Sequence, residues 1–158
     1  MPTIKAFRMD GLGNKFVIVD RRKDIVNITK EKIIHLGNLE SFHREIGFDQ
    51  IIFVEREINK AFPITIFNSD GGEVSACGNG SRCVAYLLGK DLNTKEVKLK
   101  TNNRLLNAKI VGHLDVELAM GKPIFEWNKI PLSKNLDHSN ITLNIEDKVF
   151  TDGFCLNV

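Results

Sequence analysis

The stretch of the chain best equipped for chemistry runs from Phe67 to Cys83 and reads FNSDGGEVSACGNGSRC. A strand-like end and a turn precede Cys77, and the small residues Gly78, Asn79 and Gly80 are predicted to open a helix. Unpaired N–H groups and a partial positive charge gather at a helix N-terminus, where they suit a carboxylate and stabilise a thiolate. The segment would therefore place a base beside an anion clamp, which suits removal of a proton from the carbon next to a carboxylate.

The residues of this segment alone leave a second interpretation open, in which Cys77 is a small core residue and the glycines only make a turn. Cys83 lies six residues further on, about 240° around a helix, and is more typical of a core thiol. Cys155 lies in a strand-like run and is predicted to be structural. Because the spacing of Cys77 and Cys83 is not that of a zinc site and the four histidines are scattered, we expect no metal site.

Two other short segments carry polar residues that could contact a ligand. Residues 10–14, DGLGN, resemble half of a dinucleotide-binding motif, but they precede a strand where that motif should follow one, so nucleotide binding is rejected. The segment is either a plain turn or a glycine turn that presents Asn14 to a substrate. In the same way, Asp49 and Gln50 of the GFDQ segment are either polar residues at a strand edge or ligand contacts.

The elements that must position these residues are mostly strands. Hydrophobic patterning predicts a long helix over 29–44, with Thr29 as a possible N-cap, and a short helix over 81–88 that ends at Gly89. After Lys122-Pro123, which marks a plausible boundary, two more strands are expected. The predicted strands are 16–19, 51–54, 62–67, an antiparallel meander of 96–101, 104–111 and 116–120, and then 141–145 and 149–158.

The composition describes an ordinary globular protein. The 158 residues are enough for roughly one domain with its own core, and 42% hydrophobic with 27% charged residues exclude disorder and low complexity. A net charge of +2 gives no strong field to attract nucleic acid or an acidic membrane face. No run resembles a signal peptide or a membrane span, and three cysteines fit a reducing cytosol, so a cytoplasmic location is predicted.

Four motifs occur in order at sensible distances, and together they resemble the amino-terminal half of a diaminopimelate epimerase. They are MDGLGNKF at 9–16, GFDQ at 47–50, FNSDGGEV at 67–74 and CGNGSRC at 77–83. The resemblance implies an α+β fold of two lobes, each a mostly antiparallel sheet wrapped around a central helix. On that basis residues 1–120 would form the first lobe and residues 121–158 the start of an incomplete second lobe.

The resemblance also implies roles for particular residues. Cys77 matches the first lobe's catalytic cysteine in a two-base mechanism that needs no cofactor and interconverts LL- and meso-diaminopimelate, a small amino acid. Gly78 and Asn79 match the backbone clamp for the substrate carboxylate. The side chains that match those holding the substrate are Asn14, Gln50 and Asn68.

The chain departs from the family pattern at three positions. Asp10 stands where the family usually has His, Lys15 where it usually has Asp, and Glu45 where Gly is common. A second catalytic cysteine is not recognisable, and the chain stops within an apolar run, so truncation is expected, with a homo-oligomer or a missing second lobe as its partner. Two alternatives stay open: an inactive fragment or association module, and another racemase or isomerase of the same fold, such as a proline racemase.

Overall fold

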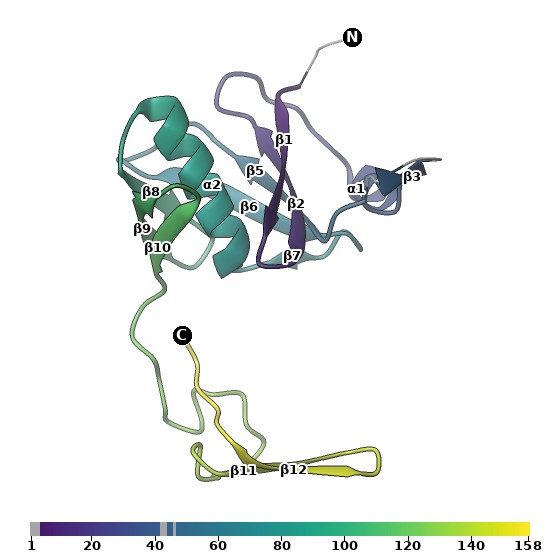
Figure 1. The fold of residues 1–158 in the computed structure, drawn as a ribbon, viewed down its shortest axis with the longest axis vertical. Coiled ribbons are helices and arrows are strands. Elements are labelled where there is room, and N and C mark those ends of the chain that lie inside the picture. The colour runs from purple at the N-terminus through teal and green to yellow at the C-terminus, as the bar shows by residue number, and fades with distance from the viewer. Residues whose placement is uncertain (1–3, 42–43, 46) are drawn as a thin grey trace. The chain divides into compact units, whose positions relative to one another are not determined.

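The computed structural model describes residues 4–41, 44–45 and 47–158 (Figure 1). The chain divides into two compact units, Met1–Ala119 and Met120–Val158. The first unit holds both helices and the large sheet. The second holds irregular segments and one antiparallel hairpin, formed by β11 (Ile141–Ile145) and β12 (Lys148–Gly153).

The sheet of the first unit is mixed, with the strand order β1-β2-β5-β6-β8-β9-β10 and with β7 paired to β6. Two neighbouring pairs, β2 with β5 and β6 with β8, are parallel, and the others are antiparallel. The bounds are β1 (Ala6–Gly11), β2 (Asn14–Asp20), β5 (Gln50–Val54), β6 (Phe62–Asn68), β7 (Glu73–Val74), β8 (Glu96–Lys100), β9 (Leu105–Gly112) and β10 (Asp115–Ala119). This curled sheet, with a helix packed inside the curl, confirms the predicted α+β class (Figure 1).

The helix inside the curl is α2 (Gly78–Leu92), which is longer at both ends than the predicted 81–88. It ends at Asn93, a left-handed C-cap whose backbone N–H donates to the carbonyl of Gly89. Gly89, predicted to follow the helix, lies inside its last turns and is buried. A Cβ at Gly89 would lie 2.7 Å from Ile110 Cδ1, so the glycine permits close packing on β9 and does not end the helix.

The other helix, α1 (Lys30–Gly37), is shorter than the predicted 29–44. Thr29 is its N-cap, as predicted, and its side chain accepts a hydrogen bond from the Lys32 N–H. Asn38 ends the helix, because its backbone N–H and its side-chain amide both donate to the Ile34 carbonyl. The expected order of a long helix followed by a short one is therefore wrong. The short strands β3 (Glu40–Ser41) and β4 (Arg44–Glu45) follow, and residues 42–43 of the predicted helix lie outside the described residues.

Residues of β2 and β5 alternate between two hydrophobic cores, one on each face of the sheet. Phe16, Ile18 and Ile52 pack toward α2 in the larger core, whose other buried members come from the helix, β6, β8 and β9. Val19, Ile51 and other neighbours form a smaller core with Ile33 of α1. Because both faces are covered, the central strands are apolar throughout, which is why 51–54 was recognisable as a buried strand.

Most remaining strand predictions are confirmed, with differences at particular sites. The strands β1 and β7 were not predicted, because β1 alternates charged and apolar residues and β7 has only two residues. The last predicted strand, 149–158, ends at Gly153 in β12, so Cys155 is not in a strand and is only half-buried.

Within the described part of the chain, no helix is long and apolar enough to cross a bilayer.

Candidate active site

Cys77 is the N-cap of α2 and has extended backbone angles, φ −147° and ψ 108°. Its Sγ accepts a hydrogen bond from the Gly80 N–H at 3.3 Å, and its carbonyl accepts the first intrahelical bond, from the Ser81 N–H at 2.9 Å. The thiol is half-exposed. The sequence prediction that Cys77 directly precedes a helix N-terminus is therefore confirmed, and the backbone N–H groups of Gly78 and Asn79 lie ahead of the first intrahelical bond.

Asn79 connects the first turn of α2 to the β1–β2 hairpin. Its side-chain Nδ2 donates to Asn14 Oδ1 at 3.0 Å, although the two residues are 65 positions apart in the chain. Asn14 is the first residue of β2 and directly follows the hairpin turn of Leu12 and Gly13, both of which have positive φ. The turn thus presents Asn14 to the start of α2, which Figure 1 shows beside the hairpin.

Gln50 and Asn68 form a second amide pair on neighbouring strands. They are register partners of the antiparallel β5–β6 pair, and Gln50 Nε2 donates to Asn68 Oδ1 at 2.9 Å. Gln50 Oε1 is buried and has no hydrogen-bond partner among the described residues. A buried acceptor without a donor costs about 1–3 kcal/mol, so this oxygen is a candidate contact for a bound ligand.

The register of the sheet explains why these amides share one end of it. The parallel β2–β5 pair begins with Phe16 opposite Gln50, so Asn14 and Gln50 lie at the same end of adjacent strands. Asp49 joins the two strands, because its backbone N–H donates to the Lys15 carbonyl and its carboxylate accepts the Lys15 N–H at 2.8 Å. The structure therefore collects Asn14, Gln50 and Asn68 from three strands at one sheet end, and it links Asn14 directly to the start of α2 through Asn79.

Gly80 lets the first turn of α2 approach the sheet closely. A Cβ at this position would lie 2.6 Å from Ile52 Cδ1 and 3.2 Å from Phe16 Cε1, both on fully buried side chains. Glycine at 80 is thus required by packing. The same close approach brings the helix start to the sheet end that carries Asn14.

Cys83, six residues after Cys77, is a buried thiol on α2, with 7% of the residue exposed. Burial is the main cause that raises the pKa of its thiol above the usual range. The prediction that Cys83 is a core residue is therefore confirmed. It lines, together with Asp10, Asn79, Arg82 and other residues, a cavity of about 310 Å³ between β1, α2 and β10.

The sequence analysis assigned no role to Arg82, and it left Asp49 open as either a polar residue at a strand edge or a ligand contact. Arg82 Nη2 donates to Asn79 Oδ1, and Asp49 Oδ2 accepts from Asn14 Nδ2 at 3.5 Å. The spacing of Asn79 and Arg82, three residues apart on a helix, was the available signal for the first contact. Asp49 stood beside Gln50 in a recognised motif, but its contacts depend on strand pairing between distant segments.

Two of the departures from the family pattern lie together near this site. Asp10 of β1 and Lys15 of β2 are direct register partners in the hairpin. Glu45 is the register partner of Glu40 in the β3–β4 pair, and its side chain lies outside the described part of the structure.

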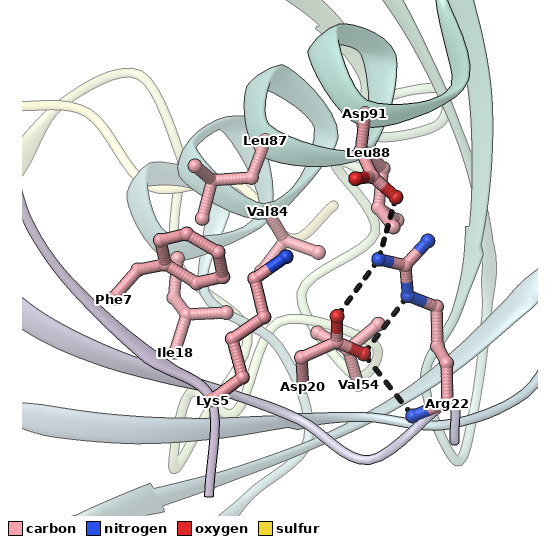
Figure 2. Close-up of a pocket in the computed structure, with 10 residues that line it drawn as sticks. All are labelled: Lys5, Phe7, Ile18, Asp20, Arg22, Val54, Val84, Leu87, Leu88 and Asp91. Atoms are coloured by element: carbon pink, nitrogen blue, oxygen red, sulfur yellow. Dashed lines mark hydrogen bonds and ion pairs between the residues drawn. The ribbon is translucent and has the colours of Figure 1, made fainter.

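A different pocket lies at the other end of α2, and it is too small to bind a substrate. Asp20, Arg22 and Asp91 form an ion-pair cluster there, with Lys5 and several apolar side chains around it (Figure 2). The cavity volume is about 30 Å³, which is the space of one water molecule and too small for an amino acid. We interpret this cluster as a structural connection between β2 and the last turns of α2.

Within the described ranges, no three His, Cys, Asp or Glu residues group as metal ligands would.

The solved structures that resemble this chain define the class of fold. A predicted epimerase from Pseudomonas aeruginosa superposes with a TM-score of 0.57 at 16% identity, covering 83% of this chain and 51% of that one. A hydroxyproline epimerase from Agrobacterium vitis gives a TM-score of 0.56 at 15% identity, covering 94% of this chain and 47% of that one. Such low identities show the fold alone, and the fold is that of these epimerases.

The sequence comparisons are more specific. The diaminopimelate epimerase family matches residues 6–126, and the chain belongs to that family. The diaminopimelate epimerase of Pelagibacter ubique (strain HTCC1062) is 44% identical over 158 residues, which cover 98% of this chain and 56% of that protein. The enzyme of Acidiphilium cryptum (strain JF-5) is 38% identical over 136 residues, covering 86% of this chain and 48% of that protein. The chain thus spans about half the length of the curated relatives it matches.

Proposed function

We propose that the chain supplies the first lobe, within residues 1–120, of an epimerase that interconverts LL- and meso-diaminopimelate without a cofactor, and that residues 121–158 begin the second lobe. One observation carries the proposal. Cys77 caps the helix that Asn79 connects to Asn14, at the sheet end that also holds Gln50 and Asn68. Family membership supports the same reaction.

In the proposed reaction, the Cys77 thiolate removes the α-proton of the substrate, and the electron pair left on the α-carbon delocalises into the adjacent carboxylate. The backbone N–H groups of Gly78 and Asn79, at the positive end of α2, stabilise the negative charge that grows on the carboxylate oxygens. A thiol on the opposite face of the α-carbon then donates a proton, which inverts the configuration. Each step moves one proton, and the substrate is neither oxidised nor reduced.

The amide side chains support a substrate with two polar ends. Asn14 and Asn79 lie at the helix start, whereas Gln50 and Asn68 form a separate pair across β5 and β6. The buried Gln50 Oε1 is an acceptor suited to a substrate ammonium group. A long diamino diacid can use both sets of amides, but proline has no second polar end, so we place a proline racemase second.

The proposed reaction needs a second catalytic thiol opposite Cys77, and neither of the other two cysteines fits that role. Cys83 is buried on the same helix as Cys77, and Cys155 precedes the position at which the family resemblance places the next motif of the second lobe. We therefore expect the 158-residue chain alone to leave the configuration of diaminopimelate unchanged. It can still exchange the α-proton on one face, because one thiolate is enough to remove and return a proton.

The decisive experiment compares this chain with a chimera in which it replaces the matched part of the Pelagibacter ubique enzyme. Both are incubated with LL-diaminopimelate in D₂O, and deuterium at the α-carbon and the stereoisomer ratio are measured. We expect inversion by the chimera, none by its Cys77→Ala variant, and no inversion of proline or hydroxyproline. A chimera that keeps its rate without Cys77 would rule out the proposed base, and one that inverts proline preferentially would favour the second candidate.

The partner of this lobe can be tested separately. The strands β1 and β10 end the sheet, so among the described residues each pairs on one side only. Unpaired edges favour association, and we propose that a second lobe or a second copy of the chain covers them. Sedimentation over a wide concentration range should show a dimer or larger species. A stable monomer at every concentration would argue against a second copy of the chain covering these edges.

A further inference from the structure

We propose that Arg82 and Asp49 together fix which way the amide groups of Asn79 and Asn14 point, which makes both charged residues positioning residues of the site. The functional part of this inference rests on the proposed epimerase reaction. The structural part concerns only hydrogen bonds within the first unit.

The four side chains form one continuous series of hydrogen bonds. Arg82 Nη2 donates to Asn79 Oδ1, and Asn79 Nδ2 donates to Asn14 Oδ1 at 3.0 Å. Asn14 Nδ2 in turn donates to Asp49 Oδ2 at 3.5 Å. The same Asp49 oxygen accepts the backbone N–H of Lys15 at 2.8 Å, which holds the carboxylate in place against β2.

The charged residues at the two ends of this series determine which atom of each amide group is the oxygen and which is the nitrogen. An arginine side chain can only donate hydrogen bonds, so the Asn79 atom that faces it must be the oxygen. A carboxylate can only accept them, so the Asn14 atom that faces Asp49 must be the nitrogen. With both ends set, the remaining contact has one solution, in which the nitrogen of Asn79 meets the oxygen of Asn14. Either amide reversed would leave two donors or two acceptors in contact.

The direction of these amides matters because they lie where a substrate would meet Cys77. Asn79 is two residues after Cys77 at the start of α2, and Asn14 is exposed at the start of β2. An amide that turned over would offer a carbonyl oxygen in place of an N–H group, and a carboxylate substrate would be repelled there. The half-buried Arg82 therefore acts on the substrate through Asn79.

The competing explanation is that Arg82 and Asn79 are only a stabilising pair on the surface of a helix. Such a pair would contribute to helix stability, but it would not determine what the amide presents to a ligand. The two explanations differ in what a lysine at position 82 should do. A lysine keeps a pure donor at this position, whereas a methionine of similar length removes the donor.

The test uses the ¹⁵N-labelled chain in four forms: the wild type, Arg82→Met, Arg82→Lys and the control Arg56→Met, which makes the same change at an exposed arginine. The first readout is the pair of side-chain NH₂ proton signals of Asn79, assigned with an Asn79→Asp variant. In the wild type the two protons should differ widely in chemical shift, because one of them donates to Asn14. We expect the difference to collapse in Arg82→Met and to survive in Arg82→Lys and Arg56→Met.

The second readout is the concentration of meso-diaminopimelate that halves the alkylation rate of Cys77. Loss of a hydrogen bond from a charged donor predicts an increase of about tenfold or more in Arg82→Met, a smaller increase in Arg82→Lys, and no change in Arg56→Met. The buried Cys83 thiol reports the fold, since it should stay unlabelled in every variant.

The outcomes separate this inference from the proposed function. If Arg82→Met keeps the wild-type NH₂ signals, Arg82 does not orient Asn79 and the inference is overturned. If the signals collapse but protection of Cys77 is unchanged, the positioning role is overturned and only the helix pair remains. If diaminopimelate fails to protect even the wild-type chain, the proposed function loses support while the NH₂ signals still decide the amide orientation.

Discussion

Asp10 and Lys15 are direct cross-strand partners in the β1–β2 hairpin, one residue outside the Gly11–Asn14 pair that flanks the turn. The sequence analysis identified both positions as departures from the family that the chain resembles, where the resemblance led us to expect His and Asp. The register shows that the two departures affect one pair of facing residues. An acidic residue at 10 opposite a basic residue at 15 keeps opposite charges across the strands, a favourable arrangement in antiparallel sheets. We therefore interpret the two changes as compensating.

Compensation can be measured with a double-mutant cycle. Lys15→Asp alone places a carboxylate opposite Asp10 and beside Asp49, whose own carboxylate accepts the residue-15 N–H. We expect it to lower the free energy of unfolding by about 0.2–1 kcal/mol, and addition of Asp10→His to recover most of the loss. Urea denaturation of the single and double variants gives the coupling energy. Additive effects would mean that the two positions do not interact.

Cys77 should react with an alkylating agent well before Cys83. Cys77 is half-exposed at a helix start, whereas Cys83 is buried and its raised pKa leaves it as the less reactive neutral thiol. Brief alkylation near neutral pH followed by peptide mapping should show a rate ratio on the order of tenfold or more. Cys155 was expected in a strand, but it lies outside any strand and is half-buried, so we do not expect burial to protect it as it protects Cys83. Labelling of Cys83 first would remove the physical support for Cys77 as the base.

The features of this site that depend on neighbouring residues in the chain could be predicted from sequence, whereas those that depend on contacts between distant segments could not. The position of Cys77 before a helix depends on a few consecutive residues, and the prediction is confirmed. The placement of Asn14 and Gln50 at one end of the sheet depends on the parallel pairing of β2 and β5, whose paired residues are more than thirty positions apart. No local pattern encodes such a pairing, so only the family resemblance grouped these residues in advance.

The helix lengths were mispredicted for a related reason. Glycine is a residue type expected at a helix end, but at position 89 close packing against Ile110 explains why the residue is glycine. In α1, by contrast, Gly37 is the last helical residue and also packs closely on Ser69, where a Cβ would lie 2.8 Å from the Ser69 Cβ, yet the predicted helix ran past it. A glycine that is required by a distant neighbour cannot be distinguished in the sequence from one that is required by its own backbone angles.

Gly80→Ala should move the start of α2 away from the sheet. Alanine favours the helix by up to about 1 kcal/mol, but its Cβ would lie 2.6 Å from Ile52 Cδ1 in a fully buried site. Overpacking of this kind costs about 1–3 kcal/mol, so we expect a net loss of stability and a longer contact between Asn79 and Asn14. Thermal unfolding and the Asn79 side-chain signals measure the two effects. Gly112→Ala is the control, since its Cβ would meet only Asp115 at 3.3 Å, and an equal loss there would contradict the packing argument.

The last prediction concerns the ion-pair cluster at the other end of α2 (Figure 2). Arg22 makes two side-chain hydrogen bonds to Asp20, at 2.9 and 2.8 Å, and one to Asp91 at 2.7 Å, which connects the end of β2 to the last turns of the helix. These hydrogen bonds from Arg22 are the main cause that lowers the pKa of both carboxyl groups. Removal of the guanidinium in Arg22→Met should therefore lower the free energy of unfolding at neutral pH by about 1–2 kcal/mol.

The pH dependence distinguishes this ion-pair effect from lost packing. A carboxyl group whose pKa is lower in the folded chain stabilises the fold fully above its unfolded pKa, near 4, and the contribution is lost as the pH falls through the lowered folded value. The difference between wild type and Arg22→Met should accordingly be largest at pH 6–7 and shrink progressively below about pH 4. Urea denaturation over this range measures it, with Lys129→Met as the control, because Lys129 and Glu126 form an exposed pair that should contribute nothing measurable. A difference that stays constant down to low pH would show that Arg22 acts through its aliphatic packing and not through its charge.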